Sequence, residues 1–312
     1  MQAAFREGST GAAAAGRGHH VKIIGEREKV KMLWSLLFIS LIGSAQNDDG
    51  TALCNTQRLP LNGTKTSQKS NYTDANQLIY SSARATDGNM TTCAITGKES
   101  DPWWRIDLLR VCNISCITIY NTAEDNTDIS GAQIHIGSSR ENNTITNSIC
   151  ENITNFKKNN SNNFTCNTTM SGRYITVFYP GNKPLILCEV MIYGTITDPP
   201  FVLINESKTW EEALYYCRDN YMDLASIVDE DTQAWAELEA KKANTPFVWL
   251  GLHYTCTLEF WFWVDDQRLD FNRWKPEKKR GDCGMSGAME TREEHLWFST
   301  SDYETFYFIC AK

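Results

Sequence analysis

Eleven cysteines, the first of them Cys54, constrain this 312-residue chain more than any other feature. In an oxidising compartment most of them would form disulfides, which limit the paths the backbone can take. In a reducing compartment they would be ordinary thiols. Because the number is odd, at least one cysteine stays free or joins a second chain. The compartment in which the chain folds therefore decides whether these cysteines form disulfides.

A short apolar segment near the N-terminus predicts secretion. Residues 33–43 read LWSLLFISLIG, follow two closely spaced lysines and run into a triplet of small residues. Eleven residues are too few to span a bilayer, which needs about 20, whereas this arrangement is typical of a cleaved signal. We expect a signal peptide at 32–45, starting at Met32 and cut after Ala45. Residues 1–31 would be an upstream extension, and an uncleaved anchor is the alternative.

Cleavage would leave all the cysteines in a secreted, extracellular chain. The mature part has 24 basic and 35 acidic residues, a net charge of −11, which argues against a protein that binds nucleic acid phosphates. Secretion also makes the ten Asn-x-Ser/Thr sequons candidates for glycosylation, although an Asn- and Thr-rich stretch also produces such sequences by chance. They are at Asn62, Asn71, Asn89, Asn113, Asn142, Asn152, Asn159, Asn163, Asn167 and Asn205.

The part of the chain before the sequence TDPP at 197–200 has the pattern of an all-β domain. Short runs rich in β-branched and aromatic residues alternate with turns rich in Gly, Asn and Ser, without helical periodicity between them. This spacing is typical of a β-sandwich or jelly roll, and the proline pair predicts a short linker after it. The clearest runs are residues 116–120, 132–136, 173–178 and 185–192.

The pattern changes after the predicted linker. Thr209 and Glu212 form a capping box before apolar residues at helical spacing, which predicts a helix over 210–220. A second helix is expected between Asp229 and Pro246. Three strand-like runs follow, so this part should form an α+β domain with a mainly antiparallel sheet. The runs are residues 247–252, 260–264 and 306–310.

Motifs in both parts resemble lectin families. PWWRIDLL, SGAQIHIG, GRYITV and LCEV, which begin at residues 102, 130, 172 and 187, resemble the fucose-binding F-type lectins, or fucolectins. WEEAL, WLGL, WFW and FIC, which begin at residues 210, 249, 261 and 308, resemble the C-type lectin-like domain. The resemblances cover about residues 52–195 and 200–312. They imply a multidomain chain with a β-sandwich domain at 46–198 and an α+β C-type lectin-like domain at 199–312.

The resemblances also imply disulfides. Two pairs follow from the F-type lectins and one from the C-type domain, in which Cys217 pairs with Cys310. The usual second bridge of the C-type domain is altered, because the place of one of its cysteines is Asp302. We therefore assign the remaining cysteine of this half, Cys256, to Cys283. The expected pairs are Cys93–Cys188, Cys150–Cys166, Cys217–Cys310 and Cys256–Cys283.

Cys54, Cys112 and Cys116 are then left. On a regular strand Cys112 and Cys116 lie on one face about 13 Å apart, whereas a disulfide tolerates Cα atoms only about 7 Å apart. They should not pair with each other without a local bend, and one of them can pair with Cys54. The other is free or links two chains into a homo-oligomer, and a buried inert thiol is an equal alternative.

The F-type resemblance implies a calcium site between an Asp-Gly-Asn turn and a Cys-Glu pair. This chain has ATDGN at 85–89 and CE at 188–189. Calcium binds six to eight hard oxygens, so two carboxylates and four backbone carbonyls would make a complete site. The alternative is that the first sequence is only a turn. The expected carboxylate ligands are Asp87 and Glu189, and the expected carbonyl ligands are Arg84, Asn89, Thr92 and Cys188.

The fucose pocket that the resemblance implies is degenerate. The family contacts fucose through one His and two Arg around a pair of adjacent cysteines, and this chain has none of these at the corresponding places. Each charge-assisted hydrogen bond is worth about 1.5–3 kcal/mol, so we expect weak or no binding of ordinary fucose. Ile95 stands in place of the His, and Thr122 and Asp128 stand in place of the two Arg.

The C-type site that the second resemblance implies is substituted too. Sugar-binding members hold calcium with an acidic or amide triplet around a proline, with an acid two residues before a cysteine, and with a Trp-Asn-Asp triplet. The segment KPEKKR at 275–280 puts positive charge where the cation would bind, so we expect no calcium there. The residues at these places are Lys275, Pro276, Glu277 and Gly281, and Phe298 and Ser299 after a tryptophan.

An enzyme is not expected. The predicted mature chain has three histidines and lacks the sequence motifs of zinc proteases, serine hydrolases, nucleotide-binding loops and dithiol oxidoreductases. Two hypotheses remain. One is a secreted lectin-family recognition protein of the defence type, which holds calcium in its first domain and binds fucosylated or other glycans. The other is a protein-interaction module, with a glycoprotein or protein ligand, that keeps both lectin scaffolds without their sugar chemistry.

Overall fold

The computed structural model describes residues 54–139 and 147–312, which belong to one compact unit, Thr51–Lys312. The expected signal peptide, the upstream extension and the sequon at Asn142 lie outside the described residues. Among the described residues, no helix is both long enough and apolar enough to cross a membrane.

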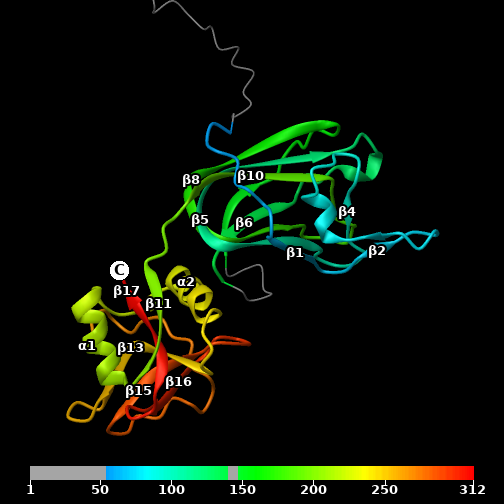
Figure 1. Cartoon of the computed structure of the whole chain (residues 1–312). Helices are drawn as coiled ribbons and strands as arrows, with labels where there is room; N and C mark the ends of the chain where they lie inside the picture. The colour runs from blue at the N-terminus through cyan, green and yellow to red at the C-terminus, as the bar shows by residue number, and fades with distance from the viewer. Residues whose placement is uncertain (1–53, 140–146) are drawn as a thin grey trace, which may run out of the picture. The chain divides into compact units, whose positions relative to one another are not determined.

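The first part of the described chain is all-β, as predicted (Figure 1). The long strand β5 pairs along its length with β8, and its other edge pairs first with β1 and then with β10. β8 continues the antiparallel sheet to β6 and β7, and two short ladders join β2 to β3 and β4 to β9. The strands are β1 (Lys65–Gln68), β2 (Tyr72–Thr73), β3 (Ile79–Tyr80), β4 (Ala94–Ile95), β5 (Trp103–Asn121), β6 (Gln133–Gly137), β7 (Ser148–Asn152), β8 (Asn160–Phe178), β9 (Ile186–Leu187) and β10 (Glu189–Ile196), with 3-10 turns η1 (Ser82–Ala85) and η2 (Asp125–Thr127).

The second part is α+β, again as predicted. Its sheet has the order β11-β17-β13-β15-β16, with β12 added to β17 and β14 to β13, and only the β13–β17 pair is parallel among the described strands. Capping boxes start both helices, Thr209 with Glu212 and Asp229 with Thr232. The elements are β11 (Phe201–Lys208), α1 (Trp210–Asn220), β12 (Asp223–Leu224), α2 (Glu230–Ala240), β13 (Phe247–Thr255), β14 (Phe260–Trp263), β15 (Met285–Glu290), β16 (Trp297–Ser301) and β17 (Phe306–Ala311).

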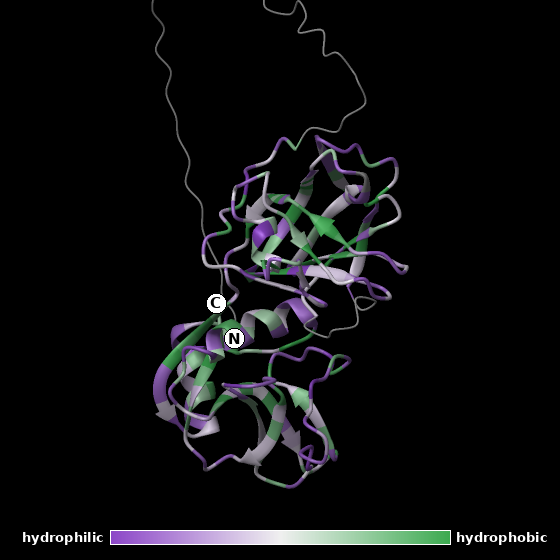
Figure 2. Cartoon of the chain, turned by 90° about the vertical axis from the view of Figure 1, so that its right-hand side faces the viewer, coloured by the Kyte–Doolittle hydropathy of each residue, from purple (hydrophilic) through white to green (hydrophobic). Residues whose placement is uncertain are grey.

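Apolar side chains gather inside both parts. Figure 2 shows the hydrophobic residues concentrated in the sheets and most loops hydrophilic. In the first part, Trp104 and Ile117 of β5 are among the fully buried core residues. In the second part the large residues Trp249, Trp263 and Trp297 are fully buried. Burial of this apolar surface is the main driving force for both folds.

A β-bulge in β5 changes the predicted positions of two cysteines. Next to β10, Ile114 faces Gly194 and Cys116 faces Tyr193, so Ser115 is an additional residue in β5. Because the side-chain alternation shifts there, Ile114 and Ile117 both belong to the core and Cys116 lies on the opposite face. A Cβ atom on Gly194 would collide with the Asn113 carbonyl, so glycine permits this close approach. The prediction that Cys112 and Cys116 share a face is therefore wrong.

Five disulfides use ten of the cysteines. The four pairs expected from the sequence are present, and Cys54 pairs with Cys116. The free residue is Cys112, which is 1% exposed and packs in the first core. Burial raises the pKa of its thiol to about 11, with Arg110 opposing the shift. A buried thiol cannot reach a second chain, so the buried alternative holds and the proposed disulfide link between two chains is wrong.

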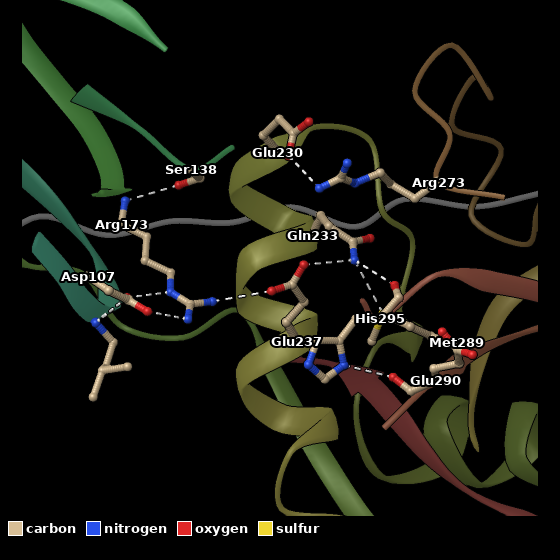
Figure 3. Close-up of polar contacts among 11 residues, drawn as sticks. Asp107, Ser138, Arg173, Glu230, Gln233, Glu237, Arg273, Met289, Glu290 and His295 are labelled. Atoms are coloured by element: carbon tan, nitrogen blue, oxygen red, sulfur yellow. Dashed lines mark hydrogen bonds and ion pairs between the residues drawn. The ribbon is translucent and has the colours of Figure 1, made fainter. Parts of the chain in front are cut away.

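A buried arginine connects the two parts (Figure 3). Arg173 of β8 donates two hydrogen bonds to Asp107 of β5, at 2.7 and 2.8 Å, and its Nη1 lies 3.3 Å from Oε2 of Glu237 in α2. Glu237 also accepts from Gln233, which accepts from the Trp297 indole. Burial lowers the pKa of Arg173, but the bonds to Asp107 and the nearby acidic groups outweigh it and leave the pKa raised. The guanidinium is therefore a charged link between the sheet of the first part and helix α2 of the second.

The buried thiol generates the first prediction. In the oxidised mature protein, Cys112 should not react with an aromatic disulfide reagent at pH 8, because the reactive thiolate is both rare and inaccessible. One thiol per chain should react in guanidinium, and Cys112→Ala should abolish that signal. Stoichiometric labelling of the native protein, or a reducible dimer on non-reducing electrophoresis, would contradict this assignment.

The second prediction concerns Arg173. Arg173→Ala should lower the free energy of unfolding by about 3–5 kcal/mol, because the carboxylates of Asp107 and Glu237 would lose their cation. The matched control is Arg218→Ala, which breaks a pair with Asp223 whose arginine is 44% exposed and should cost less than about 1 kcal/mol. Guanidinium unfolding measures both variants. Equal costs would mean that the link contributes no more than a surface pair.

Candidate functional site

The Asp-Gly-Asn sequence folds into a tight turn after η1. Asp87 Oδ1 accepts from the Asn89 amide at 2.9 Å, and Oδ2 accepts from the Thr92 hydroxyl at 2.6 Å. The Thr92 amide donates to the Asn89 carbonyl at 3.0 Å. Gly88 has a φ of +79°, a conformation that glycine adopts without strain. The turn thus brings the Asp87 carboxylate and the Asn89 carbonyl to the same residue, Thr92.

Glu189 lies against this turn. Its Oε2 accepts from the Gly88 amide at 3.1 Å, and the Cys93–Cys188 disulfide joins the two segments beside it. Burial raises the pKa of Glu189, which is 2% exposed, and nearby Asp87 adds to the rise. The Gly88 amide and Arg58, whose Nη2 lies 3.4 Å from Oε1, oppose it. Two carboxylates close together, one of them buried, favour a bound cation.

The remaining residues expected at this site also lie nearby. Arg84 is in η1, where its side chain donates to the Ile79 carbonyl at 3.3 Å and lies over the Tyr80 ring, so its charge is engaged away from its own carbonyl. Within residues 54–139 and 147–312, no three Asp, Glu, His or Cys side chains form a metal-binding group. A cation here would therefore take most ligands from backbone carbonyls, the donor set that calcium accepts and softer metals do not.

Arg58 is a site residue that sequence reasoning missed. It pairs with Glu189 across 131 residues of sequence, and no motif surrounds it. A cavity of about 460 Å³ lies beside this pair and is lined by Arg58, Asp87 and Gly88 among others. Arg58 supplies a positive charge at a site otherwise dominated by carboxylates, and its side chain is 51% exposed, so it can move.

The three substituted fucose positions lie around one end of the first sheet. Ile95 is in β4 and faces Ile186 of β9. The buried amide of Asn121 donates to the Ile186 carbonyl at 2.9 Å and to the Thr127 carbonyl at 2.7 Å, which ties β9 to the loop that carries Thr122 and Asp128. The fold therefore places these positions together although the residue types differ from the family pattern.

A second missed residue lies at this end of the sheet. The Lys183 ammonium donates to the Asp128 carbonyl at 2.8 Å and lies 4.2 Å from the centre of the Tyr179 ring. The Ser130 amide holds the pKa of the Asp128 carboxyl below its usual range, so this carboxyl stays ionised near neutral pH. Lys183 therefore adds a positive charge beside Asp128, one of the three substituted positions.

The substituted C-type positions lie between β16 and the loop after Trp274. The Lys275 amide donates to the Trp297 carbonyl at 2.9 Å, and its ammonium lies 3.0 Å from Glu290 and over the Phe298 ring. The hydrogen bond to Glu290 raises the pKa of Lys275. Pro276 and Glu277 follow in the loop, which Ser299 holds by hydrogen bonds. Gly281 lies against Tyr254, with which a Cβ atom at this position would collide. The Lys275 ammonium, paired with Glu290, therefore lies among the substituted C-type positions.

A Ser–His–Asp group in the second domain lacks the geometry of a hydrolase. His253 Nδ1 lies 2.8 Å from the Ser286 hydroxyl and 3.9 Å from Asp302 Oδ1, so both partners meet the same ring nitrogen. A catalytic triad needs the serine and the acid at opposite nitrogens. Ser286 is also fully buried. Burial lowers the pKa of His253, with Asp302 opposing it, so the ring is mainly neutral near pH 7.

Two family models match the chain. One described as a NedA-like, galactose-binding domain matches residues 84–177, and one described as a Lectin C-type domain matches residues 206–312. A solved F-lectin (fucolectin) from the serum of Morone saxatilis, the striped bass, is 33% identical with a TM-score of 0.39, and the match covers 43% of this chain and 46% of that chain.

Similar known proteins include lectins of both kinds. C-type lectin domain family 17, member A, from Homo sapiens is 31% identical over 111 residues, which cover 34% of this chain and 27% of that protein. Fucolectin-5 from Anguilla japonica is 33% identical over 176 residues, and the match covers 54% of this chain and 93% of that protein. Fucolectin-4 from the same eel is 35% identical, with 54% and 96% covered. With relatives matched over nearly their whole length, the chain belongs to the fucolectin family, and a C-type lectin domain follows its fucolectin part.

Proposed function

We propose that this protein is a secreted, glycosylated recognition lectin with a structural calcium ion in its fucolectin domain. The observation that carries the proposal is the meeting of Asp87 with buried Glu189 beside the Cys93–Cys188 disulfide. The fucolectin domain would extend over 46–198 and the C-type domain over 199–312. Five disulfides are consistent with an extracellular location, and a role in innate defence would follow from glycan recognition there.

The calcium ion would act as a cross-link. Ligands from the turn (Asp87 and the carbonyls of Asn89 and Thr92) and from the segment Cys188–Glu189 would meet at one ion, with the Arg84 carbonyl completing the set. The ion would also neutralise the two carboxylates, since burial, together with nearby Asp87, raises the pKa of Glu189. This would fix the surface beside the degenerate pocket without the ion touching a sugar.

Glycan recognition in the fucolectin domain would use altered contacts. The pocket positions are Ile95, Thr122 and Asp128, so the bonds that the family makes to fucose are not available, whereas Lys183 and Tyr179 supply a cation and an aromatic face nearby. We therefore expect preference for a glycan other than ordinary fucose. The second candidate function is a protein-interaction module, which the substitutions in both lectin sites favour.

The third prediction tests the calcium site. Saturating calcium should raise the melting temperature of the wild type by several degrees, since ligand at 100 times Kd stabilises by about 2.7 kcal/mol. Asp87→Asn and Glu189→Gln should each remove most of this shift. Asp265→Asn is the control, because Asp265 is exposed and lies in the other domain. A wild type indifferent to calcium and chelator in differential scanning calorimetry would contradict the proposal.

The fourth prediction tests the altered pocket. Wild type should bind fucosylated glycans weakly or not at all on a glycan panel, and the triple variant I95H/T122R/D128R should gain at least tenfold in affinity for fucose, because each restored charged donor is worth about 1.5–3 kcal/mol. I95Q/T122Q/D128Q is the control for the change of size. Strong wild-type binding to fucose would contradict the assignment, and a complete absence of glycan binding would favour a protein ligand.

A further inference from the structure

The C-type lectin domain contains a cavity of about 380 Å³ beside the substituted calcium position. Its walls come from β16, which supplies Phe298 and Ser299, from Phe247 of β13, and from the loop that carries Lys278 and Arg280. This volume lies in the range of cavities that bind small molecules. The described residues that line it include two cations and no carboxylate.

The two cations are available for a ligand. Both Lys278 and Arg280 are exposed, and neither forms an ion pair with another described residue. Lys275 differs, because Glu290 neutralises it at 3.0 Å. Glu277 belongs to the same loop but does not line the cavity. The positive charge is therefore local, in a chain whose predicted mature part has a net charge of −11.

Ser299 holds the loop in place. Its amide donates to the Lys278 carbonyl at 3.1 Å, and its hydroxyl donates to the same carbonyl at 2.9 Å. The Arg280 amide donates to that hydroxyl at 2.9 Å. All three bonds use backbone atoms of the loop, so none of them involves the side chain of Lys278 or Arg280. The loop that carries the cations is therefore fixed to β16 by protein groups alone.

The other walls suit a sugar ring. Phe247 and Phe298 meet edge to face with ring centres 5.2 Å apart, and both are only partly buried. Aromatic faces pack against the apolar C–H groups of a pyranose, while Thr300 and Ser301 add hydroxyl groups to the lining. Cations, hydroxyls and aromatic rings in one cavity match a ligand that has a negative group attached to a sugar.

We propose that this cavity binds the sulfate or carboxylate of an acidic oligosaccharide without calcium. Lys278 and Arg280 contact the anionic group, and the two phenylalanines contact the ring that carries it. The inference rests on the proposed glycan recognition, and it assigns to the C-type domain a ligand class and a site of its own. No metal ion takes part, because the anionic group of the ligand contacts Lys278 and Arg280 directly.

The fifth prediction tests this site by surface plasmon resonance with the mature glycosylated protein and a chelator present. The probes are a sulfated heparin tetrasaccharide, its desulfated form and sialyllactose with lactose as its neutral partner. Wild type should bind the sulfated tetrasaccharide more than tenfold more tightly than its desulfated form, or sialyllactose more than tenfold more tightly than lactose. K278Q/R280Q should lose at least tenfold in affinity, because the bonds that Ser299 makes to the loop backbone survive the change.

Two further variants separate the site from general charge and from folding. Arg292→Gln removes an exposed cation of the same domain outside the cavity and should leave binding within twofold. Phe298→Ala should weaken the acidic sugar more than inorganic sulfate. Equal losses in Arg292→Gln, dependence on calcium, or no acidic-glycan binding by natively folded wild type would overturn the proposal. Neutral-glycan binding that persists in such a protein would leave the proposed function standing.

Discussion

The Cys93–Cys188 disulfide is the constraint on which the first domain's candidate surface depends. It joins segments 95 residues apart and fastens the Asp-Gly-Asn turn to the start of β10, where Glu189 lies. Two residues after one cysteine, Ile95 pairs with Ile186, two residues before the other. The bond therefore positions the predicted calcium ligands and the substituted sugar pocket at once. Because both sites depend on the same disulfide-linked segments, a substitution that moves the backbone at one site also affects the other.

In the second domain the residues that form the core are distinct from those at the substituted site. Three fully buried tryptophans, Trp249, Trp263 and Trp297, belong to the core clusters, and none of the substituted site residues is a member of these clusters. Ser299 attaches the site loop to β16 through hydrogen bonds with the backbone of Lys278 and Arg280. The fold can therefore persist while the chemistry of the site changes, which is why a lectin fold alone does not define the ligand.

Local signals and the family resemblances predicted most of the fold, including four disulfides, whereas contacts outside these patterns could not be predicted. The capping boxes gave both helix starts because they act within four residues. The bulge at Ser115 has no local signal, because it depends on how β10 pairs, and it put Cys112 and Cys116 on opposite faces. At the candidate calcium site the motif residues were predicted, whereas the Arg58–Glu189 pair arises only from folding.

The most direct measurement is the anomalous scattering of crystals of the mature protein grown with calcium. We expect one strong peak between the carboxylates of Asp87 and Glu189, with backbone carbonyls of the turn and of Cys188 around it, and no peak beside Lys275 and Ser299 in the C-type domain. A calcium ion in the C-type domain, with none between Asp87 and Glu189, would contradict the proposed calcium site.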